Sequence, residues 1–237
     1  MWWKVPRIWA GGDVWIIGGG PSLVEQFEIP VEIVEQVRRG DLPLSAYSSY
    51  MEAIHKKHTI GVNVSFKLGS WIDMAFFGDN GFLLKYQYEL SNFAGLRVSC
   101  NPLTKKYKWI KTLLKDKGSR NGENRTWGMC PRADTVCWNN NSGSAAINVA
   151  ANMGAKRIFL LGFDMAMNES GQQHWHSEYG TRAERRLKKE PPFKMHKKGF
   201  PLIAKAAEER GIRIINVSPN STIEEFEKMT LKEALQL

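Results

Sequence analysis

Short apolar runs alternate with amphipathic segments along almost the whole chain. Each run has four to six residues and is followed at once by a glycine or a small polar residue; the runs are 13–17, 59–62, 72–77, 96–100, 135–138, 157–161 and 212–217. Apolar residues recur at helical spacing in four further segments, 31–39, 82–90, 144–153 and 199–210. Short buried strands separated by amphipathic helices predict a mostly parallel sheet that is covered on both faces.

Right-handed crossovers between such strands give a doubly wound, Rossmann-like α/β domain. At 237 residues the chain fits a single domain spanning 1–237. Two polar, weakly periodic segments, 105–134 and 166–198, are candidate lid insertions. Near the carboxyl end, Thr222 and Glu225 have the spacing of a capping box and predict the start of a terminal helix.

Composition places the chain among ordinary soluble globular proteins. Hydrophobic residues make up 43% and charged residues 24%. No stretch approaches the ~20 apolar residues of a membrane span, and the opening segment 1–7 is broken by charge and proline, unlike a secretory signal. We therefore expect the protein to act in the cytoplasm. Cys100, Cys130 and Cys137 lack zinc-site spacing, so free thiols in a reducing compartment are expected.

The chain is basic, with a formal charge of +9 and a pI near 9.5. Much of the excess lies in two stretches, 105–125 and 182–198. A basic surface suits DNA, an anionic lipid surface or a sugar nucleotide. Solvated helix faces and loops explain the same charge equally well.

A glycine loop, Gly18-Gly19-Gly20-Pro21-Ser22, follows the first expected strand. Glycines there let the backbone approach a ligand closely, and amides at a helix start bind phosphate, although a plain turn has the same composition. The loop is not the dinucleotide fingerprint, because Leu23 stands where a third glycine is needed and the next strand ends in Asn63 instead of an acidic residue. The chain also lacks the GK[ST] element of a P-loop. A dehydrogenase and a P-loop kinase are both disfavoured.

Polar residues also follow three later strands. Asn141-Ser142-Gly143 leads from a strand into a helix and offers side-chain hydrogen bonds together with free amides; the alternative is that Ser142 is simply an N-cap. Asp79 and Asp164 each end an apolar run. A carboxylate in that position binds ribose hydroxyls, acts as a base, holds a metal or caps a helix, and the sequence leaves these roles open.

Three histidines lie in the polar stretch after Asp164. His174-Trp175-His176 suits either two metal ligands or a phosphate-facing donor beside a stacking ring. No third ligand is evident, so no metal site is predicted. His196 is flanked by lysines, which would lower its pKa and favour a neutral imidazole that acts as a general base; an ordinary surface histidine is the alternative.

Together these motifs resemble glycosyltransferase family 42, the bacterial α-2,3/2,8-sialyltransferases. That family shows strand-Gly-Asn-Gly-Pro-Ser-Leu, a strand ending in Cys-Asn, a Thr-Ser-Gly turn, a strand ending Gly-Ile-Asp, and a histidine before a helix, a strand and Pro-Asn-Ser. The matching positions here are Gly18 to Leu23, Val62-Asn63, Asn141-Ser142-Gly143, Gly162-Phe163-Asp164, His196 and Pro219-Asn220-Ser221. The chain also looks like a broad group of often phage-encoded proteins, without an assigned activity, that carry GGGPSL, NSG, GFD and HWH.

The resemblance implies a GT-A-like variant of the Rossmann-like fold and a division of roles. The loop from Gly18 to Ser22, Asn63 and the Asn141 turn would hold the nucleotide of a sugar donor, and His196 would deprotonate the acceptor hydroxyl. Two positions depart from the family. Gly19 replaces its loop asparagine, and Ala166 replaces a tyrosine that helps neutralise the leaving phosphate. His174, Trp175 or a basic residue would then replace that tyrosine, and donors other than CMP-sialic acid are equally expected.

The leading hypothesis is therefore a glycosyltransferase that moves a sugar from a nucleotide sugar to a hydroxyl with inversion, without a firmly implied cofactor. The acceptor is open between a hydroxymethylated base in phage DNA, a virion protein and a host glycan, and the basic charge favours DNA. One alternative is a pyrophosphokinase of the 6-hydroxymethylpterin type, with Mg²⁺ on Asp79 and Asp164. Another is a non-catalytic nucleotide- or DNA-binding module.

Overall fold

A computed structural model describes residues 1–117, 128–179 and 192–237. Eight strands form one sheet in the order β10-β9-β8-β1-β2-β3-β4-β5, and every neighbouring pair is parallel. These strands are β1 (Asp13–Ile17), β2 (His58–Val62), β3 (Met74–Phe77), β4 (Leu96–Ser99), β5 (Lys111–Thr112), β8 (Arg157–Leu161), β9 (Arg213–Asn216) and β10 (Glu227–Lys228). Two further strands, β6 (Leu114–Asp116) and β7 (Thr135–Cys137), form a separate parallel pair.

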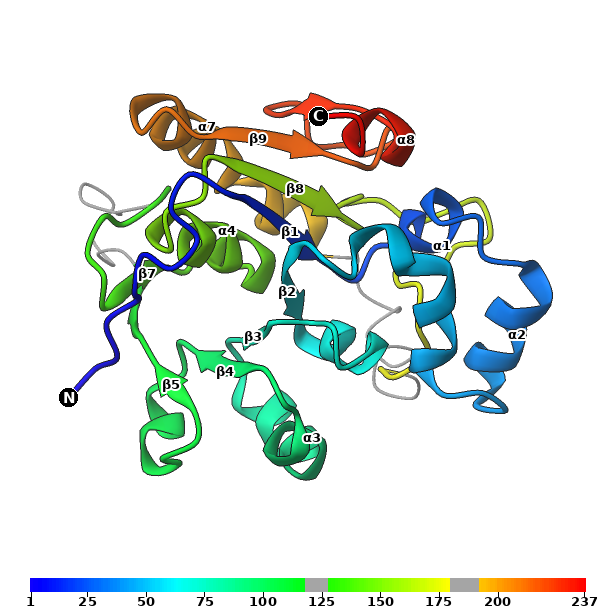
Figure 1. The fold of residues 1–237 in the computed structure, drawn as a ribbon, viewed down its shortest axis with the longest axis horizontal. Coiled ribbons are helices and arrows are strands. Elements are labelled where there is room, and N and C mark those ends of the chain that lie inside the picture. The colour runs from blue at the N-terminus through cyan, green and yellow to red at the C-terminus, as the bar shows by residue number, and fades with distance from the viewer. Residues whose placement is uncertain (118–127, 180–191) are drawn as a thin grey trace.

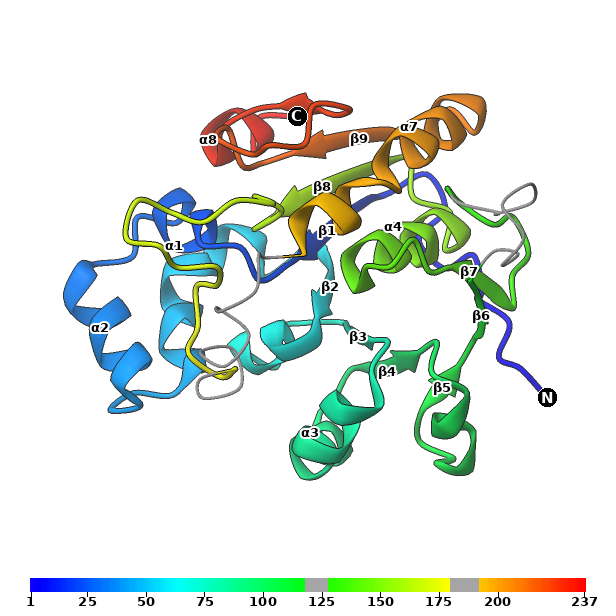
Figure 2. The same ribbon diagram turned by 180° about the vertical axis from the view of Figure 1, so that it is seen from behind.

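Helices cover both faces of the sheet (Figures 1 and 2). One face carries α4 (Ser142–Asn152) and α7 (Phe200–Glu209). The other carries α1 (Ser22–Gln26), α2 (Val31–Arg39), η1 (Leu44–Ile54), η2 (Asn63–Leu68), α3 (Asn80–Asn92) and α8 (Leu231–Ala234). Two short helices, η3 (Pro102–Lys106) and α6 (Phe193–Lys197), complete the described elements. This arrangement confirms the predicted α/β, Rossmann-like class with a mostly parallel sheet.

The alternation of side chains along β1 explains why its sequence is continuously apolar. Val14 and Ile16 point into the core beneath α4 and α7, whereas Trp15 and Ile17 point into the core on the opposite face. Successive side chains of a strand face opposite sides of the sheet. Because both sides are covered by helices, the positions from Val14 to Ile17 are all buried and need apolar residues, whereas Asp13 at the start of the strand is half-buried.

The predicted start of the terminal helix is wrong. The segment after Thr222 is irregular and leads into β10, and the last helix begins at Leu231. A capping box is present there instead, with Thr230 at the N-cap and Glu233 at the third helical position. The hydroxyl of Thr222 donates to the carbonyl of Met165 at 2.9 Å, so this hydroxyl makes a tertiary contact instead of capping a helix.

The basic segment after β4 contains strands that the polar pattern did not predict. β5 continues the main sheet beside β4, and β6 pairs with β7. The amide of Trp3 donates to the carbonyl of Thr112 at 2.9 Å and ties the amino-terminal segment to β5. Residues 118–127 and 180–191 of the two candidate lids lie outside the described part of the chain.

All three cysteines are free, as predicted. Cys100 and Cys137 are buried and Cys130 is half-buried. Within residues 1–117, 128–179 and 192–237, no helix combines the length and apolar character needed to cross a membrane.

Candidate functional site

A cavity of about 200 Å³ lies beyond the carboxyl ends of the central strands. β1 is flanked by β2 on one side and β8 on the other, so the chain leaves it in one direction and returns on the opposite side. Such a switch point opens a crevice in which doubly wound proteins bind ligands. The volume is below the ~300–1,000 Å³ typical of small-molecule pockets, so a nucleotide sugar would protrude from the described walls.

Twelve of the fifteen residues that the sequence predicts for the site line this cavity. They are Gly18, Gly19, Gly20, Asn63, Asp79, Asn141, Ser142, Gly143, Asp164, His174, His176 and His196. Pro21, Ser22 and Trp175 do not line it. The carboxyl ends of β1, β2, β3 and β8 and the amino end of α4 thus meet, as strand-end reasoning predicts.

Packing inside the protein explains two of the three loop glycines. A Cβ atom at Gly18 would lie 2.7 Å from the carbonyl oxygen of Gly162. A Cβ at Gly20 would lie 1.7 Å from Oδ2 of Asp164, well inside van der Waals contact. The loop therefore needs glycine to lie against the end of β8, and close approach to a ligand is not the only reason for its composition.

The His174-Trp175-His176 segment lies directly on the glycine loop. The backbone amide of Trp175 donates to the carbonyl of Gly19 at 3.1 Å, and its indole Nε1 donates to the carbonyl of Gly18 at 2.9 Å. Trp175 is 1% exposed and its ring packs edge-on against Tyr47. The predicted stacking of this ring on a ligand is therefore replaced by a structural role beneath the loop.

Contacts from three other elements fix the same segment. Arg38 of α2 donates to the carbonyl of His174 at 2.9 Å. Glu178 accepts from Lys67 of η2 at 2.9 Å and from the hydroxyl of Tyr86 in α3 at 2.8 Å. The segment that carries the two histidine rings is thus held by α2, η2 and α3.

His174 and His176 form a stacked pair at the cavity wall. Their ring centres are 5.2 Å apart with planes at 2°, and the ring of Tyr179 meets both edge-on at 5.1 and 4.8 Å. Burial lowers the pKa of His174 to about 4, against the raising effect of its contact with the Gly19 carbonyl. Burial and the neighbouring His174 also lower the pKa of His176 far below its ordinary value. Both imidazoles are neutral at pH 7.

His176 stands out because neither ring nitrogen has a partner among the described residues, although the residue is only 4% exposed. His174 differs, since its Nδ1 lies 3.2 Å from the carbonyl oxygen of Gly19. Buried polar atoms are nearly always hydrogen-bonded, and an unpaired one calls for a physical account.

The Asn141 turn begins α4 with a side-chain cap. Oδ1 of Asn141 accepts from the amide of Gly143 at 2.7 Å, so the N-cap is Asn141 and not Ser142. Its Nδ2 is buried without a partner in the described part of the chain. Asn63, directly after β2, has a φ of 54°, a left-handed conformation that asparagine tolerates better than most residues. Local geometry thus explains part of the preference for asparagine at both strand ends.

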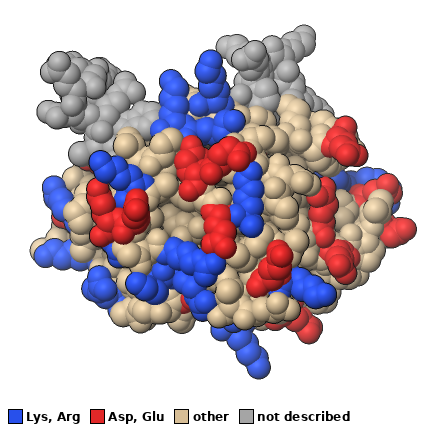
Figure 3. Space-filling view, turned by 90° about the horizontal axis from the view of Figure 1, so that it is seen from above, with Lys and Arg blue, Asp and Glu red and all other residues tan. Residues whose placement is uncertain are grey.

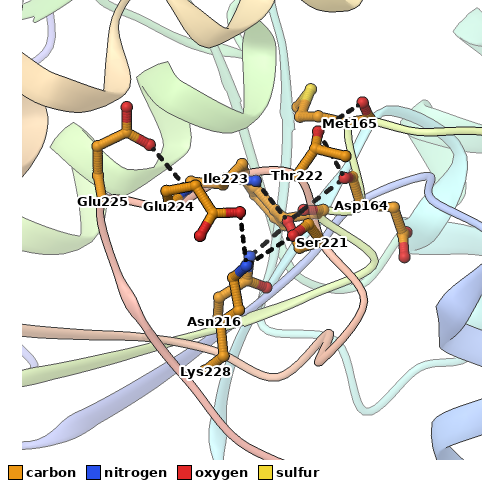
Figure 4. A network of polar contacts seen from close by, with 10 residues as sticks. Asp164, Met165, Asn216, Ser221, Thr222, Ile223, Glu224, Glu225 and Lys228 are labelled. Atoms are coloured by element: carbon orange, nitrogen blue, oxygen red, sulfur yellow. Dashed lines mark hydrogen bonds and ion pairs between the residues drawn. The ribbon is translucent and has the colours of Figure 1, made fainter.

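Asp164 is held in place by a polar network around the turn after β9 (Figure 4). Its carbonyl accepts from the amide of Thr222 at 2.9 Å, and Ser221 donates to the carbonyl of Phe163 at 2.7 Å. The carboxylate points away from this network, and no helix follows it within residues 165–179, so it caps no following helix. Burial raises the pKa of this carboxyl, and the neighbouring hydroxyl and amide of Ser22 act in the opposite direction.

His196 reaches the cavity from α6, with Asp79 on the wall formed by the end of β3. Burial lowers the pKa of His196, while the charge of Asp79 raises it. The lowering predicted from sequence is confirmed, but its cause is burial and not the flanking lysines. Asp79 occupies the N-cap position of α3 without a side-chain capping bond, so its carboxylate remains available to the cavity.

Sequence reasoning missed several residues of the wall. Tyr179, Phe163 and Trp138 line the cavity, and Lys115 lies with its Nζ 3.6 Å from the centre of the Trp138 ring and 2.9 Å from the carbonyl of Gly78. No local motif marks Tyr179 or Trp138, and Phe163 was noted only as part of the Gly162-Phe163-Asp164 match. Ser22 is buried and donates to the hydroxyl of Ser218 at 3.0 Å, so it ties the end of the glycine loop to the segment after β9.

Comparison with solved structures adds the fold family. The monofunctional α-2,3-sialyltransferase Cst-I from Campylobacter jejuni is 14% identical, with 93% of this chain and 81% of that chain covered and a TM-score of 0.54. The sialyltransferase CST-II in complex with a trisaccharide acceptor and CMP is 14% identical over 92% of this chain and 86% of its own, with a TM-score of 0.50. The chain therefore has a sialyltransferase-like glycosyltransferase fold.

A larger protein contains the same fold. MAf glycosyltransferase from Magnetospirillum magneticum AMB-1 is 10% identical, with a TM-score of 0.57 over 97% of this chain but 35% of that chain. No family model matches the sequence, and no curated protein matches it.

Proposed function

We propose that this protein is a glycosyltransferase that moves a sugar from a nucleotide sugar to an acceptor hydroxyl. The observation that carries the proposal is the convergence, in one crevice at the switch point of the sheet, of a glycine loop, the amino end of α4 and His196. The fold shared with sialyltransferases supports this choice among nucleotide-binding functions.

In the proposed reaction His196 is the general base. Its neutral imidazole takes the proton of the acceptor hydroxyl as the acceptor oxygen forms a bond to the anomeric carbon. The bond from that carbon to the phosphate oxygen breaks, and the electron pair leaves with the nucleotide. Direct displacement inverts the anomeric carbon. A positioned base of this kind contributes about 10²–10⁴-fold to the rate.

The leaving nucleotide is stabilised by the amino end of α4. Apart from the Gly143 amide, which donates to Asn141, the first amides of an α-helix such as α4 need no carbonyl of their own helix and lie at the positive end of its dipole, where anions bind. Asn141 and Ser142 sit at this end, and both line the cavity. CST-II is described with CMP as well as an acceptor, so we include CMP sugars with other nucleotide sugars as donors.

For the acceptor, a hydroxymethylated base in DNA remains part of the proposal because the chain carries a net charge of +9. Figure 3 shows lysine and arginine interspersed with acidic residues on the face seen from above, without a continuous basic surface there. A DNA acceptor predicts that turnover falls steeply with salt, whereas a neutral glycan acceptor predicts little change.

No observation favours the pyrophosphokinase alternative. Within the described residues no three His, Cys, Asp or Glu side chains gather as a metal site. Asp79 and Asp164 both line the cavity, but burial favours the protonated form of Asp164, which is a poorer metal ligand. The binding-module alternative differs from the transferase in predicting no role for His196.

The experiment measures nucleotide release from CMP, UDP, GDP and ADP sugars, in EDTA, with and without candidate acceptors. Thermal shift with the same panel reports binding, because a ligand at a hundredfold excess over Kd stabilises the fold by ~2.7 kcal/mol. The proposal expects release with one donor class and a ~10²–10⁴-fold slower turnover in His196→Gln with the thermal shift retained.

His58→Gln is the matched control, since His58 lies at the opposite end of β2 from the cavity and is about half exposed. It should turn over at the wild-type rate. If the protein bound none of the donors and released nucleotide from none of them, the proposed transferase function would be refuted. Undiminished turnover in His196→Gln would refute the assignment of the base.

A further inference from the structure

The space beside Gly19 is filled by the two histidine rings. A Cβ atom at Gly19 would lie 3.1 Å from Nδ1 of His174 and 3.8 Å from Nε2 of His176. Gly19 does not have a positive φ, so its backbone accepts any residue and the lack of a side chain is explained by these neighbours. The stacked pair therefore occupies the position that a loop side chain would take at the cavity wall.

The ring nitrogens of His174 and His176 differ in whether they have hydrogen-bond partners. Nδ1 of His174 contacts the Gly19 carbonyl, which accepts a hydrogen bond from it when that nitrogen carries the proton. His176 has no partner for either nitrogen among the described residues, and its Nε2 is the atom nearest to Gly19. A neutral imidazole keeps one N–H donor, and leaving it buried and unpaired is unfavourable.

We propose that the His174–His176 pair binds the phosphate group of the donor through His176, at the cavity wall that His176 lines. The assignment deepens the proposed function and depends on it. A phosphate oxygen at the wall of the cavity would accept the N–H of His176 and remove the unpaired donor. Tyr179 and Trp175 hold the ring from its edges, at centroid distances of 4.8 Å each, so the ring is already in position before the ligand arrives.

Charges around the pair favour an anion at this position. Arg38, Lys85 and Lys67 all lie close enough to lower the pKa of His176, which means that they make its surroundings positive. Glu178 offsets part of this charge through its bonds to Lys67 and Tyr86. An incoming phosphate meets a preformed neutral donor near three cationic side chains, while the carboxyl groups of Asp79 and Asp164 lie elsewhere on the cavity wall.

The test compares each nucleoside with its monophosphate by calorimetry, using cytidine, uridine, guanosine and adenosine against CMP, UMP, GMP and AMP. The dissociation constant of the nucleoside divided by that of its monophosphate isolates the contribution of the phosphate, and this ratio is large when the phosphate strengthens binding. His176→Phe keeps an aromatic ring of similar size but removes both nitrogens. We expect the ratio to fall by about 10- to 100-fold, the loss of one hydrogen bond to a charged group, with the affinity for the nucleoside retained.

Gly19→Ala gives a second, independent variant. Its added methyl group would lie 3.1 Å from Nδ1 of His174 and push that ring, on which His176 stacks, by a few tenths of an ångström, so the ratio should also fall. Gly81→Ala is the control, because a Cβ there meets nothing within 4 Å, and it should bind as the wild type does.

The outcomes separate the two proposals. Preferential binding of a monophosphate that His176→Phe leaves unchanged would overturn this assignment and leave the transferase intact. Should His176→Phe fail to fold, the ratio in Gly19→Ala decides. If no nucleotide binds to the wild type, the proposed function and this assignment are both wrong.

Discussion

The buried histidine pair predicts that the protein loses stability in mild acid. For His174 the pKa falls from 6.5 in the unfolded chain to about 4 in the folded protein. As the pH drops below 6.5, His174 becomes protonated in the unfolded state but stays neutral in the folded state. The contribution of His174 to the free energy of unfolding is therefore complete above pH 6.5 and decreases towards pH 4. Each unit of pKa difference corresponds to ~1.4 kcal/mol, so His174 alone removes about 3 kcal/mol over this range. His176 acts in the same direction.

The assay is urea denaturation at pH 7.5, 6.5, 5.5, 4.5 and 4, with the free energy of unfolding extrapolated to water at each pH. Carboxylates with lowered pKa values, such as Glu178, contribute to the slope of the wild type. The contribution of these carboxylates cancels when the wild type is compared with His174→Gln, since both proteins contain them. The variant should lose about 3 kcal/mol less than the wild type between pH 7.5 and 4.

If His174→Gln lost as much stability in acid as the wild type, the imidazole would not be held neutral by burial. The reasoning about the pair would then be refuted irrespective of any ligand.

Three further substitutions test the loop and its supports by the urea midpoint at pH 7.5. Gly20→Ala should destabilise the fold by more than about 3 kcal/mol, since its Cβ would overlap the Asp164 carboxylate; a smaller loss means that the carboxylate moves freely. Trp175→Phe removes the indole N–H from the Gly18 carbonyl and should cost about 1–2 kcal/mol; an unchanged midpoint would show that the bond contributes nothing. Asn141→Ala removes the cap of α4 and should cost ~1 kcal/mol, with wild-type stability as the contrary result.

The sheet could be predicted because parallel strands that are buried on both faces must be apolar throughout. The site could be located for a related reason. Carboxyl ends of parallel strands meet at one edge, so residues such as Gly18, Asn63 and Asp164, far apart in the chain, were expected together, and the cavity joins them. These predictions depend only on local patterns and on the rules of sheet topology.

The terminal helix shows where local patterns fail. Thr222 with Glu225 and Thr230 with Glu233 have the same capping spacing, and only the second pair caps a helix. The hydroxyl of Thr222 is used by Met165, which lies 57 residues earlier in the chain. The capping spacing alone cannot show which of the two threonines is engaged by a distant residue and which is free to cap a helix.

The amino-acid sequence by itself determined strands β1 to β4 and β7 to β9, the two-sided cover of helices and the edge of the sheet where polar residues gather, since all three follow from which residues tolerate burial. The tertiary structure decided what those residues do. It placed Trp175 beneath the glycine loop, Tyr179 against both histidines and the histidine pair beside Gly19, which is 155 residues before His174 in the chain. Burial also set the protonation of His174 and His196, because desolvation depends on everything packed around a group and no short segment of sequence contains that information.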